Sequence, residues 1–206
     1  YTFETTVPVV SCATGACCPI VIATLPQPTI QRADTTICQG ESKYLLTLVQ
    51  DSNPATANGA WRFFTSLQNA KDSVNQVSAS ITPSITTKYY IRRSFGACYA
   101  TDSLTITVNP LPAAAGTITA TSATCSPVRV PNSDAKIDLA GFTNGTKVSY
   151  GTSAAGFFFA TAIAMTNGDV SLTGISNPAT TTTYFLRIYG ADSTCYIDRT
   201  VSLNST

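Results

Sequence analysis

The stretch TTTYFLRIYGADSTCY (Thr181–Tyr196) closely repeats an earlier stretch, TTKYYIRRSFGACY (Thr86–Tyr99). Both copies alternate Tyr and aliphatic residues with polar ones, and both end in a Cys-Tyr pair. A proline precedes the first tyrosine of each copy by six residues, at Pro83 and Pro178. The two copies begin 95 residues apart. Because solenoid repeats recur every 20–50 residues or so, this longer spacing predicts tandem domains.

Each unit also has a cysteine far upstream of its tyrosine strand, Cys38 in TTICQGE and Cys125 in SATCSP. Each unit therefore contains, in chain order, a cysteine, several strands, the tyrosine strand, a second cysteine and a last strand. We expect a disulfide within each unit, Cys38 with Cys98 and Cys125 with Cys195. Three cysteines remain, and their pairing stays open: Cys12, Cys17 and Cys18.

The repeat divides the chain into three parts. Residues 29–112 and 113–206 are predicted to be complete domains, and residues 1–28 the C-terminal tail of a preceding repeat. The proline-containing segments LPQP (25–28) and NPLPAAAG (109–116) should act as stiff joints between them. We expect the chain to be a fragment of a longer protein.

The composition favours an all-β fold. Threonine occurs 34 times among 206 residues, and β-branched and aromatic residues suit a pleated, half-buried surface. Short alternating segments separated by turn signals predict tandem Ig-like β-sandwiches. We expect strands in YLLTLVQ (44–50), WRFFTS (61–66), VSASIT (77–82) and KVSYGTS (147–153), and no helix.

The charge balance excludes two classes of partner. The net charge is +1 and only 11% of residues are charged, so no basic surface is available for nucleic acid. The apolar runs are too short to span a bilayer, so we expect no membrane insertion. Seven cysteines in so uncharged a chain indicate an oxidising, extracellular location.

No cofactor or metal is expected. Zinc sites need CxxC pairs or histidines, and the chain has no histidine. A calcium site at Asp51 and Asn53 is the alternative we keep open, because oxygen ligands are present there.

Catalysis is not expected either. Without histidine no nucleophilic triad can form, and the closest carboxylates, Asp134 and Asp138, are better explained as solvated surface charge. The run GFFFA (156–160) cannot turn all its rings inward from one strand, and we expect a bulge or the domain junction to bury it. Arg92 and Arg187, at matching strand positions, should be exposed or stacked on neighbouring tyrosine rings.

TTICQGES (35–42) followed by TTKYYIRRSFGACYATDSLTITVNPLP (86–112) resembles the Ig-like repeats of large Bacteroidota surface proteins. These include gliding-motility adhesins exported by the type IX secretion system. The resemblance covers most of residues 29–112, and the second unit is similar to a divergent repeat of the same kind. It implies a cell-surface glycoprotein that functions in cell adhesion.

That lineage O-glycosylates Asp-Ser/Thr steps, which implies candidate sites at Thr35, Ser73, Ser103 and Ser193. The alternative is that these residues only begin turns and strands.

The function that these observations favour is a non-catalytic segment of a large extracellular bacterial adhesin, which projects or links surface domains. Its partners would be other domains of the same protein, with surface polysaccharide or another cell-envelope protein as candidate ligands. Two alternatives remain: a carbohydrate-binding accessory module of a secreted enzyme, and a subunit of a self-assembling surface fibre.

Overall fold

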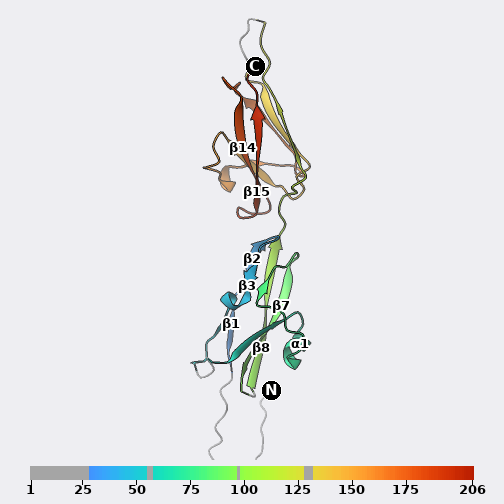
Figure 1. The fold of residues 1–206 in the computed structure, drawn as a ribbon, viewed down its shortest axis with the longest axis vertical. Coiled ribbons are helices and arrows are strands. Elements are labelled where there is room, and N and C mark those ends of the chain that lie inside the picture. The colour runs from blue at the N-terminus through green and yellow to red at the C-terminus, as the bar shows by residue number, and fades with distance from the viewer. Residues whose placement is uncertain (1–27, 55–57, 97, 128–131) are drawn as a thin grey trace, which may run out of the picture.

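The computed structural model describes residues 28–54, 58–96, 98–127 and 132–206. These residues form two β-sandwiches placed end to end along one long axis (Figure 1). Residues 1–27, predicted to be the tail of a preceding repeat, lie outside the described part. Among the described residues, no helix is long and apolar enough to cross a membrane.

The first sandwich has one four-stranded sheet and a facing layer of two strand pairs. The larger sheet runs in the order β2 (Thr35–Cys38), β8 (Cys98–Asn109), β7 (Thr87–Phe95), β5 (Ala60–Phe64). Its strands are antiparallel except β2, which runs parallel to β8. The facing layer pairs β1 (Ile30–Arg32) with β4 (Val49–Asp51) and β3 (Lys43–Tyr44) with β6 (Ser80–Ile81).

The second sandwich repeats this plan with two antiparallel sheets. One sheet runs in the order β12 (Ile163–Ala164), β11 (Lys147–Gly151), β14 (Thr182–Tyr189), β15 (Tyr196–Leu203). The other sheet runs in the order β13 (Val170–Ile175), β10 (Ala135–Ala140), β9 (Thr117–Thr121). The predicted tandem of Ig-like sandwiches is therefore confirmed. In the second unit the first, second and fifth described strands pack against the third, fourth, sixth and seventh, and in the first unit the four-stranded sheet packs against the two strand pairs.

The tyrosine strands supply the core as their alternation predicts. In β7, Ile91 is fully buried and Tyr89 nearly so, while Leu186 and Ile188 are fully buried in β14. Each sandwich has its own apolar cluster, and the two clusters share no residue. Each unit thus has a core of its own.

Two local predictions are wrong. The expected strand 44–50 is interrupted by a 3-10 helix, η1 (Leu45–Leu48), which places the Leu45 side chain fully in the core. A short helix, α1 (Leu67–Asp72), was not expected; Ser66 caps it by accepting a hydrogen bond from the Asn69 N–H. A second short 3-10 helix, η3 (Phe159–Thr161), lies in the other sandwich.

The first sandwich contains a buried ion pair. Arg93 Nε lies 2.9 Å from Asp51 Oδ2, and the two side chains are 3% and 4% exposed. The guanidinium also packs 4.6 Å from the Trp61 ring centroid and donates to the Gly59 carbonyl. A Cβ at Gly59 would lie 2.4 Å from the Ser94 carbonyl oxygen, so only glycine fits beside this arginine.

Asp51→Asn should destabilise the first sandwich strongly, because it leaves the Arg93 charge buried without its counter-ion. Breaking such a pair costs about 3–5 kcal/mol of unfolding free energy. Urea unfolding followed by far-UV circular dichroism, which reports on both sandwiches, would measure it.

The matched control is Asp198→Asn in the second sandwich. Asp198 pairs with Arg187 at 2.8 Å, but its side chain is 55% exposed, so the cost should stay below about 1 kcal/mol. Equal costs for the two variants would contradict the account of the buried pair.

Candidate functional site: the junction between the two sandwiches

A disulfide joins the two sandwiches. Cys38 at the end of β2 is bonded to Cys195 in the loop between β14 and β15, with a Cα–Cα distance of 5.3 Å. The predicted pairs, Cys38 with Cys98 and Cys125 with Cys195, are therefore wrong. Cys98 and Cys125 are free thiols.

Strand direction explains why the pairing within each unit fails. Cys38 lies opposite Asn109, the last residue of β8, whereas Cys98 is the first residue of that 12-residue strand. The strand spans roughly 36 Å, but bonded cysteines have Cα atoms within about 7 Å. The two cysteines of the first unit thus lie at opposite ends of their sandwich.

The second unit has the same arrangement. Cys195 directly precedes β15, at the end of the sandwich that faces the first domain. Cys125 lies near the other end, where Ala123 accepts a hydrogen bond from Thr206 Oγ1 at 2.7 Å. Since the eight residues of β15 span roughly 25 Å, these two cysteines cannot meet either.

On the first sandwich, a tight turn presents Cys38 to its partner. The Cys38 N–H donates to Glu41 Oε2 at 2.8 Å, and the Glu41 N–H donates back to the Cys38 carbonyl at 3.0 Å. The next residue, Gln39, donates its N–H to the Asn109 carbonyl at 2.9 Å. The turn therefore fixes Cys38 beside the point where the chain leaves the first sandwich.

On the second sandwich, Asp192 organises the loop that carries Cys195. Its Oδ1 accepts from the N–H groups of Thr194 at 2.8 Å and Cys195 at 2.9 Å. Its Oδ2 accepts from the side-chain amide of Asn109, which belongs to the first sandwich. One carboxylate thus shapes the loop and binds across the junction.

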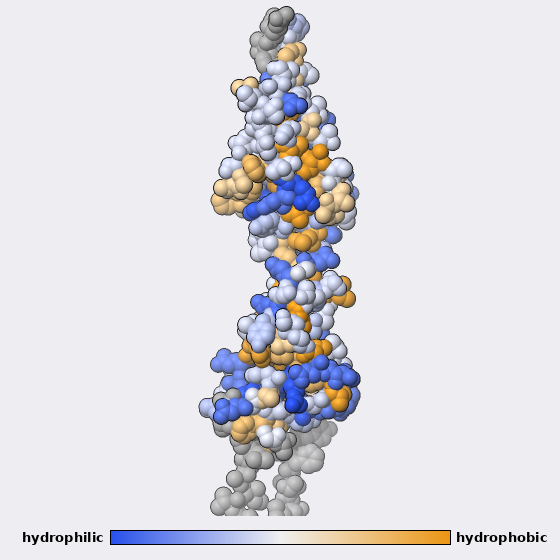
Figure 2. Space-filling model, in the orientation of Figure 1, coloured by the Kyte–Doolittle hydropathy of each residue, from blue (hydrophilic) through white to orange (hydrophobic). Residues whose placement is uncertain are grey.

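The linker itself is also held. The Leu111 carbonyl accepts from Asn144 Nδ2 at 3.4 Å, and the Ala113 N–H donates to the Thr143 carbonyl at 2.7 Å. At Gly190 a Cβ would lie 2.9 Å from the Pro110 carbonyl oxygen, so the loop can approach the linker only with glycine there. Figure 2 shows that the molecule narrows at this junction between two wider lobes.

The pKa of Asp192, the carboxylate at the junction, is shifted. Partial burial alone would raise the pKa of Asp192, but hydrogen bonds from Cys195, Thr194 and Asn109 outweigh it and hold the pKa below its ordinary value. The ionised form is therefore the one that the folded junction stabilises.

The candidate glycosylation residues lie on four separate elements. Thr35 is half-buried in β2 and Ser103 is half-buried in β8. Ser73 is the left-handed C-cap of α1 and accepts from Arg62 at 2.6 Å. Ser193 is exposed, in the junction loop. The junction loop thus presents the most accessible of the four.

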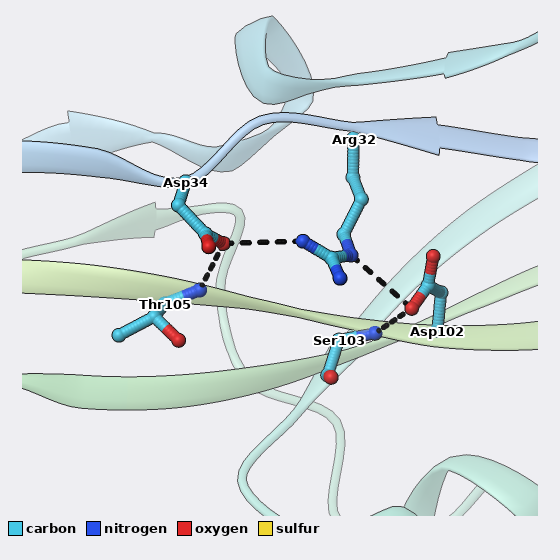
Figure 3. Close-up of polar contacts among 5 residues, drawn as sticks. All are labelled: Arg32, Asp34, Asp102, Ser103 and Thr105. Atoms are coloured by element: carbon cyan, nitrogen blue, oxygen red, sulfur yellow. Dashed lines mark hydrogen bonds and ion pairs between the residues drawn. The ribbon is translucent and has the colours of Figure 1, made fainter.

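Two aspartates of the predicted Asp-Ser/Thr motifs bind Arg32 (Figure 3). Arg32 Nη1 lies 3.3 Å from Asp34 Oδ1, and its Nε lies 3.2 Å from Asp102 Oδ1. The same oxygens accept from the N–H groups of Thr105 at 2.8 Å and Ser103 at 2.7 Å. This cluster covers the stretch of β8 that precedes its pairing with β2, so the motif residues have structural contacts.

The other candidate residues from the sequence fall away from the junction. Asp51 is committed to Arg93 and to the N–H groups of Thr29 and Asn53, which leaves a poor basis for the calcium alternative. In the described part of the chain no three metal-binding side chains cluster.

The pKa values of Asp134 and Asp138 are lowered, first by hydrogen bonds from Thr124 and Ser171 respectively, so neither resembles a general acid. Cys12, Cys17 and Cys18 lie outside the described residues.

The predicted arginine stacks are confirmed. The Arg92 guanidinium lies 3.7 Å from the Tyr99 ring centroid, and that of Arg187 lies 3.8 Å from Tyr196. The expectation that the GFFFA run is buried is wrong for Phe158, which is 65% exposed ahead of η3. Sequence reasoning missed the Asn109–Asp192 contact, although the Asp-Ser-Thr-Cys order is typical of an Asp-capped turn.

Asp192→Asn should abolish an acid titration at the junction. Because the folded pKa is lowered, the stabilisation is complete above the unfolded pKa of about 3.9 and is lost as pH falls through the folded pKa. The amide proton shifts of Thr194 and Cys195 should titrate with a midpoint below about 3.9 in the native chain. NMR spectra recorded between neutral and strongly acidic pH would show it.

The control for this titration is Asp134→Asn, at the far end of the same sandwich, which should leave the midpoint unchanged. A midpoint at or above the ordinary aspartate value, or an unchanged titration in Asp192→Asn, would contradict this role of Asp192.

Comparison with known proteins adds structural neighbours only. No family model matches the sequence, and curated proteins give no match. A three-domain titin structure, I67–I69, is 11% identical with a TM-score of 0.41, covering 89% of this chain and 66% of its own. The four N-terminal Ig domains of Dscam1 isoform 6.9 are 11% identical with a TM-score of 0.33, covering 87% of this chain and 45% of their own. These similarities are too weak to support a conclusion about this chain. The assignment of an Ig-like fold rests on the strand topology described above.

Proposed function

We propose that this chain is a non-catalytic structural segment of a large extracellular bacterial adhesin, and that it acts as a strut which resists extension. The observation that carries the proposal is the Cys38–Cys195 disulfide. With the linker, it gives the two sandwiches two covalent connections instead of one. Bending and twisting at the junction are therefore restricted.

The disulfide also shortens the covalent path between the ends of the two-domain unit. A pulling force that enters at residue 29 passes through β1 and β2 to Cys38, crosses to Cys195, and leaves through β15. This path contains 10 residues in 29–38 and 12 in 195–206. Their full extension is roughly 80 Å, whereas the whole of 29–206 could reach roughly 640 Å.

The strands on this path run along the long axis of the molecule (Figure 1). A β-strand already extends about 3.3 Å per residue, close to the maximum for a polypeptide. The covalent path can therefore lengthen only a little under load. Residues 39–194 are shielded from tension by the disulfide, whose cysteines are 157 positions apart. Both cores can stay folded while the segment bears load.

Two further observations support the extracellular part of the proposal. Structural disulfides persist in oxidising compartments, and the sequence of residues 29–112 resembles adhesin repeats of Bacteroidota. Within this proposal, export by the type IX system, a role in gliding motility and a domain boundary at residues 112–113 remain inferences from the sequence. Ser193 is the glycosylation site we favour, because its exposed loop would accept a glycan without unfolding a strand.

The carbohydrate-module alternative is less well supported. It needs aromatic faces open to a sugar, but Arg187 lies between the Tyr196 and Phe157 rings, at 3.8 and 5.5 Å from their centroids. A pocket of about 330 Å³ borders Phe157 and Asp198, and Asp198 is already paired with Arg187. Phe158 is 65% exposed but does not line this pocket, and Tyr196, which is 37% exposed, is stacked against Arg187.

The fibre alternative would require an open strand edge. In the first sandwich, β2 and the Arg32 cluster cover β8. Among the described strands of the three- and four-stranded sheets, β2 and β5 in the first sandwich and β9, β12, β13 and β15 in the second lie at sheet edges, and these are the edges at which a neighbouring strand could add.

Single-molecule pulling from the two chain ends would test the strut. In the oxidised chain, the distance between residues 29 and 206 should not exceed roughly 80 Å, the full extension of the covalent path. In Cys38→Ser, two unfolding events should appear, each releasing roughly 250–300 Å, because each sandwich can then be drawn out completely.

Cys98→Ser is the matched control, since it removes a thiol without touching the bridge, and should extend like the native chain. Two full-length unfolding events in the oxidised native chain would contradict the proposal.

A further inference from the structure

The repeat places two kinds of cysteine in each sandwich. We call Cys38 and Cys125 the upstream cysteines, and Cys98 and Cys195, which precede a tyrosine at the start of the last strand, the hairpin cysteines. The equivalence of the hairpin pair is structural: Ser94 pairs with Tyr99 on β8, as Tyr189 pairs with Tyr196 on β15. The one bridge in the described chain joins an upstream cysteine to the hairpin cysteine of the next sandwich.

The two remaining thiols are one of each kind, and they lie at the outer ends of the unit. Cys98 begins β8, at the end of the first sandwich remote from the junction. Cys125 lies beyond β9, at the remote end of the second sandwich, and is exposed. Neither can reach the other, because both sandwiches lie between them (Figure 1).

Cys125 lies at the same place in its sandwich as its bonded counterpart. Cys38 lies beside Asn109, where the chain leaves the first sandwich. Asn109 comes five residues after Leu104, which pairs with Tyr89, and Thr206 comes five residues after Val201, which pairs with the equivalent Tyr184. Thr206 in turn contacts Ala123, two residues before Cys125. An upstream cysteine thus stands at the exit of each sandwich.

We propose that Cys98 and Cys125 are the outward halves of the same interdomain bridge, and that each bonds a neighbouring domain of this kind. Cys125 would bond the hairpin cysteine of a following sandwich, and Cys98 the upstream cysteine of a preceding one. Every junction of the array would then have the covalent connection seen between Cys38 and Cys195. This inference extends the proposed strut to its neighbours and rests on that function.

The chemistry of each bridge is a thiol–disulfide exchange. Two cysteine thiols lose two protons and two electrons to a disulfide oxidant, such as oxidised glutathione, which is released as two thiols. The short linker supplies the high effective concentration that favours the neighbouring domain over a free molecule.

The first test extends the full chain at Thr206 with a second copy of residues 110–206. This copy carries its own linker, its own core and the loop with Cys195. Cys12, Cys17 and Cys18 are changed to Ser to remove their thiols. In a glutathione redox buffer, Cys125 should bond Cys195 of the added copy, and its alkylation should fall at least about tenfold relative to the unextended chain.

The original Cys38–Cys195 bridge is the internal control, because it reports that oxidation and folding succeeded. Cys125→Ser should leave Cys195 of the added copy reactive. If the original bridge forms while Cys125 stays reactive, or bonds another cysteine, the proposal is overturned.

The second test adds residues 25–206 instead, so that Cys125 faces Cys98 of the added copy. The hairpin of Cys98 is two residues shorter than the Cys195 loop, with four residues between Ser94 and Tyr99 against six between Tyr189 and Tyr196. A peptide linking Cys125 to Cys98 of the added copy supports the proposal. If Cys98 of the added copy stays a free thiol, the proposed bridge at Cys98 is overturned.

These outcomes are separate from failure of the proposed function. The strut fails if the oxidised native chain extends fully under force, and that result does not depend on the added domains. The array fails if the outer thiols stay reactive, even where the single junction resists extension.

Discussion

The bridge between Cys38 and Cys195 is the constraint on which the rest of the structure depends. Two Ig-like sandwiches joined by a short linker alone could swing and twist about it. The second covalent connection removes most of that freedom, and in the chain-entropy model a loop of this length lowers the free energy of folding by about 5 kcal/mol. The contact of Asn109 with Asp192 and the tight approach of Gly190 to the linker hold the same two surfaces together.

Much of the fold could be predicted from the repeated tyrosine strand. Its alternation places Tyr89, Ile91, Leu186 and Ile188 in the cores, and its recurrence predicts two sandwiches. Its arginines stack on the tyrosines that follow the hairpin cysteines, as expected. The η1 turn could not be predicted in the same way, because the fully buried Leu45 overrides the strand preference of its neighbours.

The spacing of the cysteines in the sequence could not predict the disulfide at the junction. Two cysteines within one repeat suggest a bridge within one domain, but the spacing does not state at which end of the sandwich each cysteine lies. That depends on strand direction: β2 runs parallel to β8, so Cys38 meets the end of β8 and not its beginning at Cys98. The partner of Asn109 was hidden for a similar reason, since it lies in the other sandwich.

The most direct measurement is a tryptic map of the unreduced, thiol-blocked chain. Cys98 and Cys125 share the peptide 94–129, whereas Cys38 lies in 33–43 and Cys195 in 188–199. The bridge between sandwiches predicts a two-peptide species of 33–43 and 188–199, with both cysteines of 94–129 blocked as free thiols. A three-peptide species joining 33–43, 94–129 and 188–199 would show bridges within the domains and contradict the account.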